Sequence, residues 1–441
     1  MEVAEFMANN NQFCILCEQE ELGGTYTTRH DLVLLEALQY GQDFEKHLIK
    51  FQSVESTYTA LESDRSTLIP KLKARESDRL KELKSEYTKN PNIEVIYGQA
   101  RFISPTLVEI KTSQGRELIS FEHCVCAVGK QDVQVPYIPG SDEERIWNEF
   151  SIFQADDLPQ SIAIIGCTQE TMDFAFLYAN LGIKVHIFES KRADACLPKF
   201  DKTILNIAFK RLLSKHVEFH FQSEVREIKK SRKNLKVITE AQEIAVSDIL
   251  LATKKLFADT INAKEIGLKS TPNGLVTTAD GRVYGGENIY AVGEANERFD
   301  LGSGKELLHN CLFSISQEFK KNKSRSDSTN LAITQSNSDP EYLKFSSEYP
   351  RILGYYEGVT IGETEYEART RYGSIIRSEA YETNSGDIVK ITYNLQTEKI
   401  LGIAISGWLS KECLLFSLYC VDHKKKLKEF TTYLRNFLDL L

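Results

Sequence analysis

Short apolar runs alternate with longer amphipathic stretches through the first three quarters of the chain. Runs of this length are typical of buried strands in a parallel sheet, and the stretches between them have the period of surface helices. The pattern predicts strands at residues 12–18, 161–166 and 184–189, and helices at residues 32–52, 61–87 and 170–181. The sequence therefore predicts an α/β architecture with one complete strand–helix–strand unit at residues 161–189.

The last quarter of the chain has a different pattern. Residues 320–347 are polar and almost unpatterned, which predicts a linker or a long surface loop. Beyond them the pattern predicts antiparallel strands at residues 374–381, 388–394 and 400–405, and helices at residues 412–420 and 424–441. We expect this tail to form a separate α+β domain.

Composition narrows the function classes. The 441 residues are 41% hydrophobic, so a sizeable core is available, and the net charge of −9 argues against a nucleic-acid-binding surface. No apolar run approaches the roughly 18 residues of a membrane span. The first ten residues lack a basic cluster, and nine cysteines are an odd count spread over a long chain. We therefore expect a cytoplasmic protein without a signal peptide or a disulfide framework.

Residues 161–189 have the layout of a dinucleotide-binding unit, in which a glycine-rich turn lets the backbone approach a pyrophosphate. Gly166 occupies the first glycine position, and Glu189 occupies the position of the ribose-binding acid. Thr168 and Thr171 replace the second and third glycines, and a β-carbon at the second position intrudes on the pyrophosphate. The layout predicts the fold, whereas the threonines predict that nucleotide binding is lost and that Glu189 is only a polar strand end.

The N-terminus suggests a second such unit that is incomplete. A helix-like stretch opens the chain, and the strand that follows it ends at Glu18, where a ribose-binding acid belongs. The first strand and its glycine turn would precede Met1. Two explanations stay open: the protein has lost this strand, or the recorded start lies downstream of the native one.

Residues 21–35 (ELGGTYTTRHDLVLL) resemble a motif of the pyridine nucleotide–disulfide oxidoreductases, of the dihydrolipoamide dehydrogenase and mercuric reductase type. Gly23, Gly24 and Thr25 match the motif, but Tyr26 and Asp31 replace its two redox cysteines. In that family the two sulfurs accept electrons from the flavin as a disulfide. A phenol and a carboxylate cannot cycle between thiol and disulfide, so the resemblance implies a degenerate member without these catalytic residues.

The resemblance extends over essentially the whole chain. CVCAVGKQ (residues 124–131) and the strand before Gly293 and Glu294 resemble the family's two flavin motifs, and the tail resembles its dimerisation domain. The family's catalytic histidine near the C-terminus is missing, because the last histidine is His423 and Phe437 lies near its place. The resemblance implies a homodimer and FAD as the cofactor, held by Glu18, Gly24, Thr25, Gly129, Gly293 and Glu294, whereas NAD(P) binding through Gly166 and Glu189 is in doubt.

This resemblance implies a fold of two three-layer dinucleotide-binding domains and a C-terminal α+β dimerisation domain. The expected boundaries are an FAD-type domain at residues 1–150 and 266–330, an NAD(P)-type domain at 151–265, a linker at 331–345 and the dimerisation domain at 346–441.

Other motifs have simpler explanations. Cys14 and Cys17 form a C-x-x-C spacing, but a predicted strand directs them to opposite faces, so buried apolar cysteines are expected. His216 and His220 share a strand face, yet the sequence places no acidic or cysteine partner beside them, which predicts that there is no metal site.

Three functions remain open on the sequence. The favoured one is a non-catalytic or regulatory homodimer, with an unidentified protein partner, that keeps the fold without disulfide chemistry. The alternative is an FAD-dependent NAD(P)H oxidoreductase that passes electrons to a quinone, oxygen or a protein without a dithiol. A pure scaffold is the third, and it gives no reason to retain Glu18 and Glu294.

Overall fold

A computed structural model describes most of the chain. The described residues are 2–19, 22, 37–40, 68–133, 137–149, 151–215, 217–232, 234–252, 254–298, 308, 310–317, 351–353, 358–382, 387–407, 410 and 413–438. The chain forms two compact units: unit 1 comprises residues 1–31, 75–133 and 254–347, and unit 2 comprises residues 32–74, 134–253 and 348–441. The domain boundaries expected from the sequence stay a prediction.

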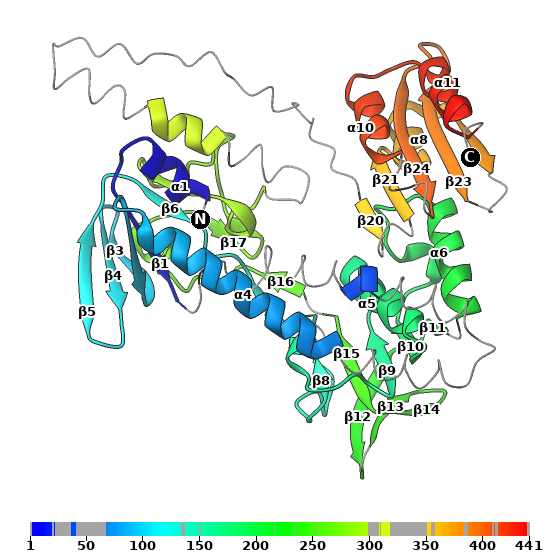
Figure 1. Cartoon of the computed structure of the whole chain (residues 1–441), viewed down its shortest axis with the longest axis horizontal. Coiled ribbons are helices and arrows are strands. Elements are labelled where there is room, and N and C mark those ends of the chain that lie inside the picture. Colours follow the sequence, from blue (N-terminus) through cyan, green and yellow to red (C-terminus); the bar gives the residue numbers. More distant parts are fainter. Residues whose placement is uncertain are drawn as a thin grey trace. The chain divides into compact units, whose positions relative to one another are not determined.

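Unit 1 contains two parallel strand pairs, β1–β2 and β6–β19, which belong to separate sheets (Figure 1). The antiparallel strands β3, β4 and β5 form a third sheet, and β7–β16 and β17–β18 are short antiparallel pairs. The elements are α1 (Glu2–Asn9), β1 (Cys14–Glu18), β2 (Ile93–Tyr97), β3 (Gln99–Ser104), β4 (Leu107–Lys111), β5 (Arg116–Ser120), β6 (Cys124–Cys126), β7 (Gln131–Val133), β16 (Lys254–Leu256), β17 (Ser270–Thr271), β18 (Gly274–Leu275) and β19 (Ile289–Ala291), with short 3-10 turns η3 (Lys264–Ile266) and η4 (Gly293–Ala295).

Helix α1 packs against both parallel pairs. Its buried residues Ala4 and Ala8 lie with Ile93 of β2, and Met7 lies with Tyr290 of β19. Spacings of three and four residues place such side chains on neighbouring parts of one helix face. Among the described residues, the two pairs therefore share a covering helix without sharing a hydrogen-bonded sheet.

The first part of unit 2 is a three-layer α/β structure around a five-stranded parallel sheet of order β11-β10-β9-β15-β8. Its elements are β8 (Ile146–Trp147), η1 (Ser151–Gln154), β9 (Ser161–Ile165), α5 (Gln169–Asn180), β10 (Lys184–Glu189), η2 (Ala193–Ala195), α6 (Lys202–Ser214), β11 (Val217–Phe221), β12 (Val225–Ser231), β13 (Asn234–Thr239), β14 (Glu243–Val246) and β15 (Asp248–Leu251). The strand–helix–strand unit predicted at residues 161–189 is confirmed as β9, α5 and β10.

Successive side chains of each strand point to opposite faces of this sheet and pack in two different interfaces. Val185 and Ile187 of β10 face the helices, whereas Phe188 faces the antiparallel strands β12, β13 and β14. Strands buried on both faces in this way read as nearly continuous apolar runs, which is why the sequence located them well.

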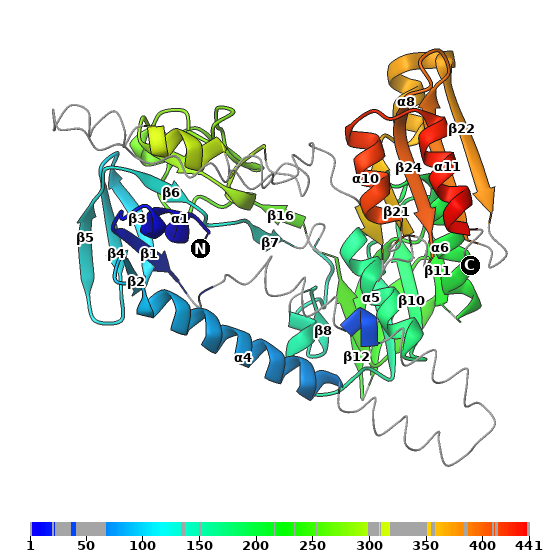
Figure 2. The same ribbon diagram turned by 45° about the horizontal axis from the view of Figure 1, so that its top comes forward.

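The C-terminal part of unit 2 is an antiparallel sheet of order β20-β21-β24-β23-β22, with α10 and α11 packed on one face (Figure 2). The elements are β20 (Arg351–Leu353), β21 (Gly358–Gly362), α8 (Glu365–Tyr372), η5 (Gly373–Ile375), β22 (Ile376–Glu382), β23 (Ile388–Asn394), β24 (Ile400–Ser406), α10 (Leu414–Asp422) and α11 (Leu427–Leu438). The predicted strands are confirmed within two residues at each end, and both helices begin two or three residues later than predicted.

Helix α6 joins the two parts of unit 2. Ile204 of α6 lies against Gly358 of β21, where a β-carbon would collide with it. Beside this contact, the Lys390 ammonium lies 3.0 Å from Asp201 Oδ2 and 2.9 Å from Glu365 Oε2. Asp201 also caps α6 by accepting a hydrogen bond from the Thr203 amide. A shared lysine therefore ties the beginning of α6 to β23 and α8.

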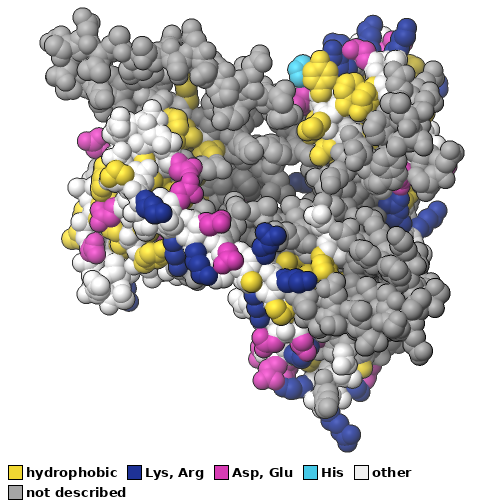
Figure 3. Space-filling model, viewed as in Figure 1, with side chains coloured by type: hydrophobic (Ala, Val, Ile, Leu, Met, Phe, Trp, Pro, Cys, Tyr) yellow, Lys and Arg dark blue, Asp and Glu magenta, His cyan; other side chains and the backbone are white. Residues whose placement is uncertain are grey.

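The surface of α4 (Leu68–Lys89) carries charges of both signs. Figure 3 shows Lys and Arg side chains interspersed with Asp and Glu side chains on the drawn face, and Lys81 pairs with Asp78 at 3.2 Å. Such a surface suits a solvated packing helix. Among the described helices, none has the length and apolar content to cross a membrane.

We expect Lys390→Met to lower the free energy of unfolding of unit 2 by about 3 kcal/mol, because it leaves the Asp201 carboxylate buried without its cation. Partial burial acts to raise the pKa of Glu365, but hydrogen bonds from Lys390 and Arg369 outweigh it and lower this pKa. The part of the effect that comes from Glu365 is therefore present above pH ~4.3 and disappears as the pH falls further and this carboxylate is protonated. Urea unfolding at several pH values measures both effects.

Lys428→Met is the matched control, because Lys428 is an exposed lysine of α11. Lys428→Met should lower the free energy of unfolding by less than about 0.5 kcal/mol. Equal costs for the two variants would contradict the structural role of Lys390.

Candidate functional site

The glycine-poor turn between β9 and α5 is built without free space for a ligand at its first residue. Gly166 adopts a positive φ of 98°, and a β-carbon there would lie 2.6 Å from the Ala252 β-carbon. Its amide donates a hydrogen bond to the Phe188 carbonyl at 2.8 Å. Glycine is required here because the chain must turn sharply beside β15 and β10.

Two threonine side chains occupy the beginning of α5. The Thr168 hydroxyl accepts a hydrogen bond from the Thr171 amide at 3.2 Å, and the Thr171 hydroxyl accepts one from the Thr168 amide at 2.9 Å. The pair forms a reciprocal capping box, with threonine in the place usually taken by Glu or Gln. The Thr171 hydroxyl also donates to the Gly166 carbonyl at 2.8 Å. The replacement of both glycines therefore gives the Thr168 and Thr171 amides acceptors from within the turn.

Glu189, at the end of β10, is held against the same turn. Its Oε2 accepts a hydrogen bond from the Cys167 amide at 2.9 Å, and its Oε1 accepts from the Lys191 amide at 2.9 Å and the Ser190 hydroxyl at 3.2 Å. Only 9% of the residue is exposed. The carboxylate is thus a structural acceptor for the turn.

Together these contacts leave a poor anion site at α5. The amides of Cys167, Thr168 and Thr171 already have side-chain acceptors from the chain itself. Glu170 adds a negative charge in the first turn, where the helix dipole otherwise favours a phosphate. The described residues therefore do not fit a dinucleotide pyrophosphate at this turn.

Unit 1 brings three of the expected flavin-binding residues to one edge. Strands β6 and β19 pair in parallel, with Ala291 opposite Cys126, so the residues after them emerge at the same end. Gly129 and Gly293 have positive φ angles of 66° and 58°, and no described atom lies within 4 Å of a β-carbon built on either. Glu294 follows in the 3-10 turn η4. Carboxyl ends of neighbouring parallel strands are where nucleotide cofactors bind in such folds, so these residues fit that role.

The segment after β19 is fixed by a residue that the sequence did not single out. The fully buried Asn296 donates from its side-chain amide to the Ala291 carbonyl at 2.9 Å and accepts from the Thr277 hydroxyl at 3.0 Å. Its two partners lie five and 19 positions away along the chain, so no local motif marks this residue. Asn296 therefore sets the path of Gly293 and Glu294.

Glu18 lies at the end of β1, as expected. It is half-buried, and its Oε1 accepts a hydrogen bond from the Gln19 amide at 2.8 Å. Its strand pairs with β2, with Glu18 opposite Tyr97. The other expected site residues Gly24, Thr25, Tyr26 and Asp31 lie outside the described residues, as does the side chain of Phe437.

The cysteines of the C-x-x-C spacing lie in strand β1, as predicted, but both are half-buried and not fully buried. Burial raises the pKa of Cys14, and burial raises that of Cys17 to about 11. The Cys17 thiol donates to the Gly98 carbonyl at 3.3 Å. Neither is a thiolate at neutral pH, and thiolates are the reactive form.

The prediction that no acidic partner lies beside His220 is wrong. Glu218 of the same strand and His186 of the neighbouring β10 both place a ligand atom within 4.8 Å of a His220 ring nitrogen. His216 lies outside the described residues. The sequence held a usable signal for Glu218, because residues two apart in a strand lie on the same face, whereas the contact with His186 depends on the pairing of β10 with β11.

A family model described as pyridine nucleotide-disulphide oxidoreductase matches residues 2–312. The dihydrolipoyl dehydrogenase of Haloferax volcanii is 27% identical over 214 residues, which are 46% of this chain and 44% of that enzyme. Dihydrolipoyl dehydrogenase 3 of Haloarcula marismortui is 22% identical over 359 residues, covering 76% of this chain and 70% of that enzyme. The match to the first of these relatives thus spans less than half of its length.

Two solved structures have the same fold. The copper(II) complex of the HOCl-induced flavoprotein disulfide reductase RclA from Escherichia coli superposes with a TM-score of 0.74 at 19% identity, covering 96% of this chain and 90% of that chain. LpdA from Mycobacterium tuberculosis superposes with a TM-score of 0.73 at 14% identity, covering 97% and 92%. They confirm the predicted fold class of paired dinucleotide-binding folds with a C-terminal domain. Because the family model covers more than half of its residues, the chain belongs to the pyridine nucleotide-disulphide oxidoreductase family.

Proposed function

We propose that this protein is a non-catalytic or regulatory member of its family, which acts as a homodimer and has lost dithiol reductase chemistry. The observation that carries the proposal is the turn before α5. There the Thr168 and Thr171 side chains and the Glu189 carboxylate accept hydrogen bonds from three backbone N–H groups at the turn where the family's nicotinamide dinucleotide would bind. Without a hydride donor at this turn, electrons have no entry to a disulfide.

The sequence supports the same conclusion at the other end of the electron path. Tyr26 and Asp31 stand where the family has its two redox cysteines, and neither side chain can form a disulfide. Phe437 stands near the position of the family's acid–base histidine, so that group is replaced as well. Three separate parts of the machinery are therefore altered together, which favours a loss of the whole reaction over a change of substrate.

One observation favours the alternative function, an FAD-dependent NAD(P)H oxidoreductase that uses no dithiol. Gly129 and Gly293 keep left-handed backbone and open surroundings at the shared end of β6 and β19, and Glu294 follows directly. Glu294 is one methylene longer than the aspartate of the family motif and still carries a hydrogen-bond acceptor. FAD bound there would supply redox chemistry, and Glu18 and Glu294 would contribute acceptors for its hydroxyl groups.

A visible absorption spectrum of the purified full chain, with and without added FAD, separates the two functions. We expect that any flavin band that is present keeps its intensity when NADH or NADPH is added under anaerobic conditions, because the turn before α5 does not accept the dinucleotide. Dithionite reduction of the same sample is the control that the flavin can be bleached. Bleaching by NADH or NADPH would reject the non-catalytic function and favour the flavin oxidoreductase.

We expect the double variant Tyr26→Cys, Asp31→Cys to show no NADH-dependent reduction of a disulfide substrate. The two new thiols would still lack a hydride source at Thr168 and Thr171 and an acid–base histidine. Free-thiol titration under denaturing conditions, before and after reduction, verifies that both cysteines are present. Robust NADH-dependent turnover by this variant would show that only the dithiol had been lost.

A further inference from the structure

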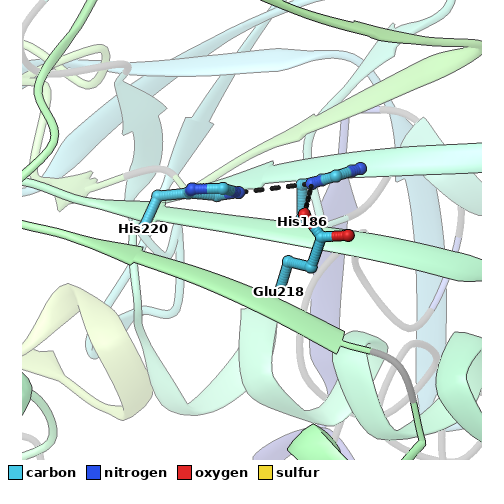
Figure 4. A group of neighbouring side chains, drawn as sticks. All are labelled: His186, Glu218 and His220. Carbon is cyan, nitrogen blue, oxygen red and sulfur yellow. Dashed lines mark hydrogen bonds and ion pairs between the residues drawn. The ribbon is translucent and has the colours of Figure 1, made fainter. Parts of the chain in front are cut away.

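Two histidines and a glutamate lie together at the edge of the parallel sheet in unit 2. His186 projects from β10, and Glu218 and His220 project from the adjacent edge strand β11. The pairing register sets His186 opposite Glu218, and His220 lies two residues further along the same face. Figure 4 shows the three side chains directed toward one another from the two strands.

The spacing of the ligand atoms matches a small coordination sphere. His186 Nδ1 lies 3.2 Å from His220 Nε2 and 3.3 Å from Glu218 Oε2, and all three ligand atoms lie within 4.8 Å of one another. A tetrahedral zinc ion with bonds of 2.0–2.1 Å separates its ligand atoms by about 3.3–3.4 Å. Two of the three separations therefore need almost no rearrangement.

The charge states also suit a cation. Burial lowers the pKa of both His186 and His220, which keeps both rings neutral and able to donate a lone pair at neutral pH. A hydrogen bond from Lys184 lowers the pKa of Glu218, so this carboxylate is ionised. Lys184 contacts Oε1 at 3.1 Å, and Oε2 is the oxygen that faces His186.

Neighbouring side chains hold the His220 ring in place. Phe188 of β10 stacks on it with ring centroids 4.5 Å apart, and the Gln242 side-chain amide lies 2.8 Å from its Nδ1. A metal-binding histidine needs such a partner at its second nitrogen, and Gln242 can present its oxygen there by turning its amide group. The second ring nitrogen of His220 is thus supported from the turn between β13 and β14.

We propose that His186, Glu218 and His220 bind one divalent first-row transition metal ion, of which Zn²⁺ is the simplest representative. Two imidazoles and one carboxylate form a ligand set that selects such ions over Mg²⁺ and Ca²⁺, which prefer oxygen ligands alone. Glu218 is half exposed, so water completes the coordination. The ion links edge strand β11 to β10, and this role is independent of flavin or nicotinamide chemistry.

Competition between the full chain and a chromophoric zinc chelator tests this site. We expect the wild-type chain to bind one equivalent of Zn²⁺. His220→Gln and Glu218→Gln should each lower the zinc affinity by at least ~10-fold, since even a supporting residue around a metal ligand typically contributes that much. Lys184→Met should bind about 3-fold more tightly, because it removes a like charge beside the site. His423→Gln, which alters an exposed histidine at the end of α10, is the matched control and should leave the affinity unchanged.

Cobalt(II) substitution and thermal unfolding give two further readouts. The Co²⁺ spectrum should have tetrahedral d–d bands without thiolate charge-transfer bands, which excludes binding through the nine cysteines. Zn²⁺ should raise the melting temperature of the wild-type chain and not that of His220→Gln. Equal zinc affinity in wild type and His220→Gln, equal affinity for Mg²⁺, or no binding at micromolar Zn²⁺ would each overturn the proposal and leave a hydrogen-bonded histidine pair. Glu218 and His220 are the least buried of the three residues, so Glu218→Gln and His220→Gln test the proposal even if His186→Gln does not fold.

Discussion

Helix α5 begins with backbone N–H groups that must be hydrogen-bonded, and the identity of their acceptors decides what unit 2 can do. In a dinucleotide-binding fold a bound pyrophosphate supplies those acceptors. In this chain the Thr168 and Thr171 hydroxyls and the Glu189 carboxylate accept hydrogen bonds from the Thr171, Thr168 and Cys167 amides. A pyrophosphate that used any of these three amides would have to displace a bond that already exists.

Polar groups elsewhere in unit 2 are also paired with one another. The Lys390 ammonium is buried among Asp201, Glu365 and the Thr203 hydroxyl, which lets α6 pack directly on the C-terminal sheet. At the sheet edge, His186 and His220 share a hydrogen bond, and Glu218 stands beside them. The Lys390 cluster links segments far apart in the chain, and the histidine cluster links two neighbouring strands. Both hold unit 2 together through polar contacts.

Much of the fold could be read from the sequence, because its strands are buried on one or both faces. The runs at residues 161–166 and 184–189 and the alternation at 388–394 were located closely, since burial imposes a visible period on apolar residues. The site was read less completely. Gly166 and Glu189 were selected by spacing, and Gly293 and Glu294 by resemblance to a family motif; their cofactor roles stay predictions. Asn296 was missed because its role depends on Thr277, a residue on another segment.

By itself, the sequence determined the strand–helix–strand unit at residues 161–189 and the resemblance to the family, and it predicts that Tyr26 and Asp31 replace the redox cysteines, because each of these depends on residue identity and local period. Only the tertiary structure decided which polar groups meet. It gave Glu189, which the sequence predicts to be only a polar strand end, the role of acceptor for the Cys167 amide. It also joined His186 to His220, which are 34 positions apart, because the pairing of two strands in a sheet fixes contacts that no local pattern records.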